Sequence, residues 1–417
     1  MRYCSKCVYP ENAKPGVIIH DDGICSGCKV ADSRDNIEWK EREDILVEIL
    51  NEHKFKQEKK GNPYHCIIPV SGGKDSTYQT WLIKKKYKLN PLLVSYNHTF
   101  NTPLGLRNLT NLIETLNCNL VRYTTAPQTA IKLAEYMLKK VGDVTWHYHA
   151  GIQTFPIQAS VAFDVPLIIW GEEGLSHMLG MFNQDDYVEF TKKKRQEHSM
   201  RGFEPEDILA EKNCPFDRYE LAPFFYPDDK LIEKVGTRGI YISNYLSWNA
   251  KKQTEFIIKE LGFETSQGRE RTFNLYDKLD DIHANGLHDY LKYLKFGYGR
   301  CTDDASTEIR YGRMTREEGI KMVEKYDPVV PSDLKIFLKK TGMTKKEFYG
   351  IIDIHRDPLI WKKKNGKWIK TDSIKNHSNK TNMKNPPKHN EKHFIKTKEK
   401  ISTHSKKTSK QNDYVIL

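Results

Sequence analysis

The sequence predicts an α/β protein: a doubly wound parallel sheet, preceded by a small cysteine-rich module and followed by a mostly helical region. Two observations carry this prediction. From Pro63 onward, short apolar segments alternate with longer helical patterns, which is typical of a parallel sheet with helices on both faces. Before that point, the first 33 residues hold four of the eight cysteines, a composition that indicates a metal-stabilised unit.

We expect five parts along the chain of 417 residues. They are a zinc-binding module (1–33), a helical linker (34–60), the α/β domain (61–262), a mostly helical C-terminal region (263–360) and a basic disordered tail (361–417). A run of charged residues from Glu38 to Asp44 predicts the linker helix.

The α/β domain is expected to supply five strands with helices between them. The alternation predicts strands at 65–70, 91–96, 119–123, 166–170 and 239–243. It predicts helices at 76–86, 106–116, 129–140 and 248–261, with two more in the C-terminal region at 283–295 and 316–325.

The charge is basic overall but unevenly placed. The net charge is +12, from 67 basic and 55 acidic residues. Residues 371–417 contain eleven Lys and four acidic residues, so +7 of that total lies there. This segment has few apolar residues and is predicted to be disordered, either as an arm for nucleic acid or a membrane surface or as a solvated tail.

The rest of the composition indicates a cytoplasmic protein. The longest apolar stretches, such as residues 165–170, are far shorter than the run of about 20 needed to cross a bilayer. The first residues also lack the apolar core of a secretory signal.

The first motif is a double pair of cysteines. Cys4 and Cys7 form one Cys-x-x-Cys pair, and Cys25 and Cys28 form the second, with seventeen residues between the pairs. This spacing predicts a tetrahedral zinc site, and four protein ligands leave no open position, so the zinc is expected to be structural. The alternative is four free thiols or two disulfides, which a cytosolic chain disfavours.

The second motif is a Ser-Gly-Gly turn between a strand and a helix. Its residues are Ser71, Gly72, Gly73, Lys74, Asp75 and Ser76. Glycines allow close backbone approach, and N–H groups at a helix start bind anions. A carboxylate beside a bound phosphate needs a cation between them, which predicts Mg²⁺ held by Asp75, with Glu172 after a later strand as a second ligand. The alternative readings are a glycine turn without a ligand and a solvated acidic turn.

An arginine-rich stretch follows in the C-terminal region. Guanidinium groups suit phosphates and carboxylates, so we expect Arg300, Arg310 and Arg313 to bind substrate. The alternative is that they form surface ion pairs with the many neighbouring acidic residues. Four histidines in or near loops of the sheet are candidate proton acceptors, with packed histidines as the alternative: His98, His147, His149 and His177.

The turn at Ser71–Ser76 resembles the signature of the PP-loop, or N-type, ATP pyrophosphatases. This resemblance implies that the α/β domain is a PP-loop ATP pyrophosphatase domain that binds ATP through the six loop residues. It also implies a reaction type, in which an amide or acid oxygen is adenylated, pyrophosphate is released and a nucleophile displaces AMP. We predict Lys74, Asp75 and Arg310 as the catalytic residues.

Within that superfamily the chain is similar to the N-acetyl sugar amidotransferases of bacterial surface-glycan biosynthesis, which serve lipopolysaccharide or flagellin glycans. The segments that carry this narrower resemblance are the cysteine module, the loop, and residues 170–174, 293–300 and 302–318. It implies that the acetamido oxygen of a nucleotide-linked sugar is adenylated and that ammonia replaces AMP, giving an acetamidino sugar. ATP, Mg²⁺ and structural Zn²⁺ are the expected cofactors.

The chain shows no glutaminase nucleophile in a Gly-x-Cys-x-Gly turn. Ammonia is therefore expected from a separate glutaminase subunit, as the resemblance also implies, and nucleic acid is not expected as a partner. Two alternatives remain: a PP-loop tRNA thiolase or other tRNA-modifying enzyme, and a zinc-bearing nucleic-acid-binding protein without catalysis. The four cysteines outside the module are isolated in sequence, which disfavours the thiolase.

Overall fold

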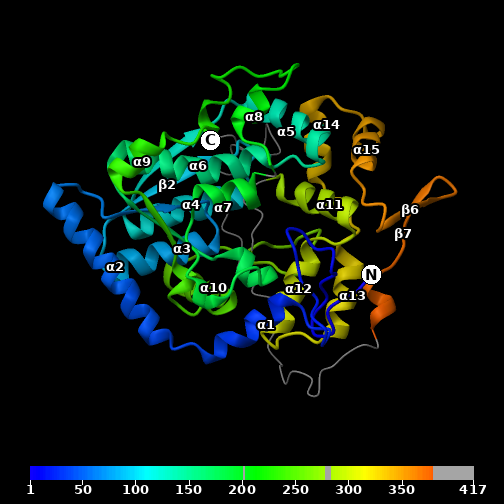
Figure 1. The fold of residues 1–417 in the computed structure, drawn as a ribbon, viewed down its shortest axis with the longest axis horizontal. Helices are drawn as coiled ribbons and strands as arrows, with labels where there is room; N and C mark the ends of the chain where they lie inside the picture. Colours follow the sequence, from blue (N-terminus) through cyan, green and yellow to red (C-terminus); the bar gives the residue numbers. More distant parts are fainter. Residues whose placement is uncertain (201, 278–282, 379–417) are drawn as a thin grey trace.

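The computed structural model describes residues 1–200, 202–277 and 283–378 and has a parallel sheet at its centre (Figure 1). The five strands lie in the order β3-β2-β1-β4-β5, and all neighbours are parallel. Their bounds are β1 Cys66–Pro69, β2 Pro91–Asn97, β3 Asn119–Thr124, β4 Leu167–Trp170 and β5 Arg238–Tyr241. The order reverses between β1 and β4, and ligands of open α/β sheets bind at the strand ends beside such a reversal.

Side chains alternate between the two faces of this sheet. Ile67 lies opposite Leu92 and Ile168 in the strand register, and these three residues share one core cluster. Ile68 and Leu93 belong to the cluster on the other face. Helices cover both faces, which confirms the predicted doubly wound fold class.

The helices that cover the first face differ from those on the second. Residues of α2 Trp39–Lys60, α4 Pro103–Leu116 and α10 Ala250–Leu261 pack with Ile68, next to α3 Lys74–Trp81 and the π-helical turn η2 Leu82–Lys86 that continues it. Residues of α5 Pro127–Val141 and α6 Trp146–Phe163 pack with Ile67.

Helix α6 was not predicted from the sequence. Eleven of its 18 residues are buried, because it packs between the sheet and other helices. A helix that is apolar on most sides lacks the one-sided pattern by which an amphipathic helix is found.

The connection between β4 and β5 consists of short helical turns. They are η3 Leu175–Leu179, η4 Gln184–Asp186, α7 Lys192–Lys194, η5 Arg195–Ser199, α8 Pro205–Leu209, η6 Ala222–Phe224 and α9 Asp229–Val235, and η7 Ile242–Asn244 follows β5.

The C-terminal region is helical, as predicted, and ends in a hairpin. Its elements are α11 Asn285–Phe296, α12 Arg300–Arg310, α13 Arg316–Tyr326, α14 Asp333–Thr341, α15 Lys345–Ile354, β6 Trp361–Lys364, β7 Lys367–Lys370 and η8 Ile374–His377. The prediction of a disordered tail from residue 361 is therefore wrong for 361–378. Asn365 and Gly366 both have positive φ, 50° and 75°, and Asn-Gly between two short strands is a strong hairpin signal. The remainder of the predicted tail, 379–417, lies outside the described residues.

The cysteine-rich segment is not a separate body. It is followed by the helix α1 Ser26–Ser33 and the turn η1 Arg34–Asn36. Val8 and Tyr9 belong to a hydrophobic core that also contains Ala305, Ile309 and Ile320 of α12 and α13. Figure 1 shows the blue N-terminal segment beside these two helices. The first and last parts of the described chain thus share one core. Within the described ranges, no helix is both long and apolar enough to span a membrane.

Candidate active site

The Ser-Gly-Gly turn lies between β1 and α3, at the reversal of strand order. Gly73 caps the helix, and Gly72 has a φ of +89°. A Cβ on Gly72 would lie 2.4 Å from the carbonyl oxygen of Gly105, so both the conformation and the space require glycine. The Ser71 hydroxyl accepts a hydrogen bond from the Gly73 N–H at 3.3 Å, and the Ser76 hydroxyl donates to the Gly73 carbonyl at 3.1 Å.

Lys74 is the buried cation of this turn. Its side chain is 2% exposed, and its Nζ lies 2.6 Å from Asp75 Oδ1 and 2.9 Å from Asp277 Oδ1. Burial alone would lower the pKa of Lys74, but Asp277, Asp75 and Glu172 together raise it above its ordinary value. The lysine therefore stays charged across the physiological range.

Asp75 lies at the centre of the acidic groups. Its Oδ1 accepts a hydrogen bond from Trp248 Nε1 at 3.2 Å. Burial raises the pKa of Asp75, as do Glu172 and Asp277, while Lys74 opposes this. A second positive charge here would favour the ionised carboxylates.

The carboxylates do not form a ready-made metal cage: within the described residues, only the four cysteines of the N-terminal segment gather closely enough for that. Mg²⁺ takes few protein ligands and completes its shell with water and phosphate oxygens. The excess of carboxylates over lysine at the loop fits that mode, with Asp75 and Glu172 as the candidate ligands.

A pocket of about 490 Å³ opens over the turn, within the usual size range of ligand pockets, roughly 300–1,000 Å³. The structure brings together seven of the predicted site residues around it: Ser71, Gly73, Lys74, Asp75, Ser76, Glu172 and Arg300. A second wall comes from α6, α11 and the segment before α6, with the residues Thr145, Tyr148, His149, Ile152, Asn285 and His288.

The predicted arginines separate in space. Arg300 lines the pocket and is held by Asp289, with two hydrogen bonds of 2.9 and 3.0 Å. Arg313 makes a bidentate ion pair with the buried Glu308, at 2.6 and 2.7 Å, and it is not among the residues that line this pocket. Glu308 takes the Nε and Nη2 donors of Arg313, so the structure gives no support to its predicted role in substrate binding at this pocket.

Arg310 lies against the cysteines instead of the loop. Its guanidinium donates to Cys28 Sγ at 3.4 Å and to the carbonyls of His177 and Met178 at 3.0 and 2.8 Å. It reaches a neighbouring hollow of about 160 Å³ that Glu172 also lines. Arg310 thus bridges the cysteine cluster and the turn after β4, and because it does not line the pocket over the Ser-Gly-Gly turn, the structure does not support its predicted catalytic role there.

The candidate histidines also separate. His98 and His149 line the pocket, and burial, with Arg122, lowers the pKa of His98 to about 3. His147 is fully buried, and His177 hydrogen-bonds to Glu172, with Nδ1 2.6 Å from Oε1.

Sequence reasoning missed His288, which lines the same pocket. What distinguishes this histidine is a contact with a residue far away in the sequence: Nδ1 of His288 lies 3.0 Å from Oδ2 of the buried Asp143. No local motif joins these two residues.

The four cysteines form one buried cluster. Their sulfur atoms all lie within 4.8 Å of one another, and all four residues are fully buried. The backbone N–H groups of Lys6, Cys7 and Cys25 donate to Cys4 Sγ at 3.2–3.4 Å. Four thiols with N–H donors fit a structural Zn²⁺ site.

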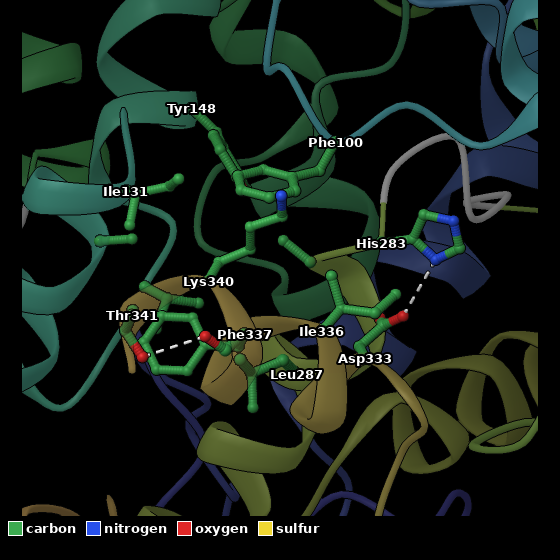
Figure 2. Close-up of a pocket in the computed structure, with 13 residues that line it drawn as sticks. Phe100, Ile131, Tyr148, His283, Leu287, Asp333, Ile336, Phe337, Lys340 and Thr341 are labelled. Carbon is green, nitrogen blue, oxygen red and sulfur yellow. Dashed lines mark hydrogen bonds and ion pairs between the residues drawn. The ribbon is translucent and has the colours of Figure 1, made fainter. Parts of the chain in front are cut away.

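A much smaller hollow lies between α5, α11 and α14 (Figure 2). Its walls are mostly apolar, and His283 at its edge contacts Asp333 at 3.3 Å. Its volume of about 20 Å³ is enough for roughly one water molecule. It is packing space and not a substrate site.

Comparison with known proteins gives a family match over the C-terminal region. Residues 269–375 match the C-terminal domain of WbpG-like LPS biosynthesis proteins. The uncharacterized protein MJ1599 of Methanocaldococcus jannaschii is 32% identical over 137 residues, which cover 32% of this chain and 47% of that protein. The chain thus spans about half the length of this curated relative.

Two solved structures resemble the chain weakly. NMN synthetase from Francisella tularensis is 16% identical and covers 54% of this chain and 94% of its own, with a TM-score of 0.26. The NH3-dependent NAD synthetase of Campylobacter jejuni is 14% identical and covers 48% and 92%, with a TM-score of 0.26. The match over residues 269–375, which includes the whole arginine-rich motif, supports the bacterial glycan-biosynthesis family that this motif resembles.

Proposed function

We propose that this chain is an ATP-dependent, AMP-forming amidotransferase that converts the acetamido group of a nucleotide-linked sugar into an acetamidino group. The observation that carries the proposal is the pocket in which the Ser-Gly-Gly turn, Lys74, Asp75 and Arg300 meet. The match to WbpG-like LPS biosynthesis proteins supports a substrate from surface-glycan synthesis.

The turn would hold the β- and γ-phosphates of ATP. Backbone N–H groups at the start of α3 and the charge of Lys74 favour anions at this point. Mg²⁺, when bound by Asp75 and Glu172, supplies charge neutralisation at the phosphates. The acetamido oxygen attacks the α-phosphorus, and pyrophosphate is the leaving group, which the turn binds as it forms.

Arg300 would orient the acceptor. Its guanidinium lies at the pocket, and the buried Asp289 fixes its plane by two hydrogen bonds. A fixed guanidinium suits a phosphate of the nucleotide carrier. This leaves the second wall of the pocket for the sugar.

Ammonia would displace AMP in the second half of the reaction. Of the cysteines outside the cluster, Cys66, Cys118 and Cys301 are buried. Within the described residues, no cysteine lines the pocket. This supports an external source of ammonia, which we assign to a separate glutaminase subunit, and it disfavours a thiol relay of the tRNA thiolase type.

The test is a direct assay of the purified chain. It is incubated with MgATP, ammonium and a panel of nucleotide-linked acetamido sugars, and mass spectrometry follows the replacement of oxygen by NH in the sugar. AMP and pyrophosphate should appear in equal amounts with the product. Glutamine in place of ammonium should give no product, so turnover with glutamine alone would contradict the assignment of a separate glutaminase.

A further inference from the structure

We propose that His288, held by Asp143, is the group that takes the proton from ammonia when AMP is displaced. The inference rests on the proposed function and adds a residue to it. His288 lies on the second wall of the pocket, which lines the same space as the Ser-Gly-Gly turn.

The two residues form an oriented carboxylate–imidazole pair. Asp143 is 1% exposed, and its Oδ2 lies 3.0 Å from His288 Nδ1. Its Oδ1 accepts hydrogen bonds from the N–H and hydroxyl of Thr145, at 2.8 and 2.6 Å. A buried carboxylate fixed in this way selects the tautomer of the imidazole with the proton on Nδ1.

The other ring nitrogen then carries the lone pair. No hydrogen bond to His288 Nε2 is found in the part of the chain that the structure describes, and this atom is not among the buried polar atoms without a partner. An imidazole with Nδ1 donating to a carboxylate and Nε2 open is the arrangement of a general base.

The surroundings of His288 are mixed in charge. The ring of His149 lies 5.9 Å away from that of His288, and Lys295 lies 3.9 Å from Asp143. The following residue, Asp289, is neutralised by Arg300. Asp143 is thus the carboxylate in direct contact with the ring.

The chemistry requires such a group. After adenylation, the nitrogen of ammonia bonds to the former carbonyl carbon and becomes positively charged. One N–H proton passes to Nε2 of His288, the bond from carbon to the oxygen of AMP breaks, and AMP leaves with both electrons. The products are the amidine and AMP, and the imidazolium returns its proton to solvent.

The contrasting pair His283 and Asp333 offers a matched control. His283 Nδ1 also lies near a carboxylate, 3.3 Å from Asp333 Oδ1. Its Nε2, however, is buried without a hydrogen-bond partner, and it lines the small hollow of Figure 2 instead of the large pocket. The two pairs differ in what the second nitrogen faces.

The experiment separates the two half-reactions with His288→Asn, Asp143→Asn and the control His283→Asn. Exchange of labelled pyrophosphate into ATP, with the sugar present and no ammonium, measures adenylation. Amidine formation with ammonium, expressed per free ammonia, measures the second half. His288→Asn should keep the exchange and reduce amidine formation about 10²–10⁴-fold. Asp143→Asn should also keep the exchange and reduce amidine formation, and His283→Asn should match the wild type in both half-reactions.

Two results would overturn the inference alone: amidine formation by His288→Asn at the wild-type rate, or equal losses in both half-reactions. Absence of amidine from the wild type with every sugar tested would overturn the proposed function, and this inference with it.

Discussion

The Ser-Gly-Gly turn and the cysteine cluster both lie where a helix begins, at α3 and α1, but their side chains are arranged differently. At the turn, charged groups surround a pocket of about 490 Å³. At the cluster, four fully buried cysteines bring their sulfur atoms together, and the guanidinium of Arg310 donates to Cys28 Sγ. The turn thus leaves room for a molecule beside its charged groups, whereas the cysteine side chains are enclosed by their neighbours.

The arginines of the C-terminal region show the same difference. Arg300 is fixed by Asp289 but still lines the pocket. Arg316 is fully buried and donates to the carbonyls of Cys4 and Cys7, at 3.2 and 3.0 Å. Arg300 is thus available to an anion in the pocket, whereas Arg316 connects the cysteine segment to the last described residues.

Loss of the metal should have the largest effect on stability. We expect one zinc per chain by elemental analysis, and Cys25→Ser should lose it and lower the free energy of unfolding by about 4 kcal/mol or more. Cys214→Ser, outside the cluster, is the control. A wild-type protein that contains no metal would disprove a structural site.

The two ion-paired arginines should respond in opposite ways. Arg313→Met breaks a buried pair with Glu308 and should cost about 3–5 kcal/mol of stability without raising the KM of the folded enzyme. Arg300→Met should raise the KM for the sugar substrate. Chemical denaturation and steady-state kinetics measure both, and an unchanged KM for Arg300→Met would place the acceptor elsewhere.

The turn itself should be sensitive to a change of charge without a change of shape. Asp75→Asn should reduce pyrophosphate release about 10²–10³-fold while the circular dichroism spectrum stays the same. Asp229→Asn removes a surface carboxylate that pairs with Lys192 and should leave the rate unaltered. Wild-type release by the Asp75 variant would rule out this turn as the ATP site.

Two truncations distinguish the segment 371–378, which contains η8, from the residues that follow it. Removing 371–417 takes away Ile374, which is 3% exposed, and the His377 carbonyl that Arg316 contacts at 2.9 Å. This should cost about 2–3 kcal/mol, measured by thermal unfolding. Removing 379–417 should leave the unfolding midpoint and the turnover with ammonium as they are, and a loss of turnover would assign that segment a part in the reaction.

The smallest effect should appear as a pH dependence. Burial opposes ionisation of Asp289, but Arg300 outweighs it and holds the pKa of Asp289 below its usual range. A lowered pKa stabilises the folded state above the unfolded pKa of about 4, and this contribution is lost as the pH falls toward the folded value. The stability difference between wild type and Arg300→Gln should therefore be full at neutral pH and shrink below about pH 4. Urea unfolding at several pH values tests this, and a constant difference would contradict it.

Local patterns were enough to predict the sheet, the turn and the cysteine pairs. The strand β1 and the start of α3 follow directly from the apolar run and the glycines before Lys74, because both the ligand groups and the elements that carry them are adjacent in sequence. The hairpin at Asn365 also has a local signal in Asn365-Gly366, but the lysines around it are typical of a solvated tail and favour that prediction instead.

Long-range pairing could not be predicted in the same way. Asp143 and His288 meet only because the segment before α6 lies beside α11, and no spacing rule joins residues 145 positions apart. The roles of Arg310 and Arg313 likewise depend on which carboxylate or carbonyl the fold places beside each guanidinium. Residue type showed that these arginines would bind something negative, but it did not show which partner.

The shared core of the first and last segments has a consequence for the order of folding. Val8 and Tyr9 pack against residues as distant as Ile320 and Val323. During synthesis at roughly 5–20 residues per second, about 15–60 s pass before that partner exists. We therefore expect the newly made cysteine segment to remain without its packing partner, and its thiols to remain accessible to solvent, during this interval.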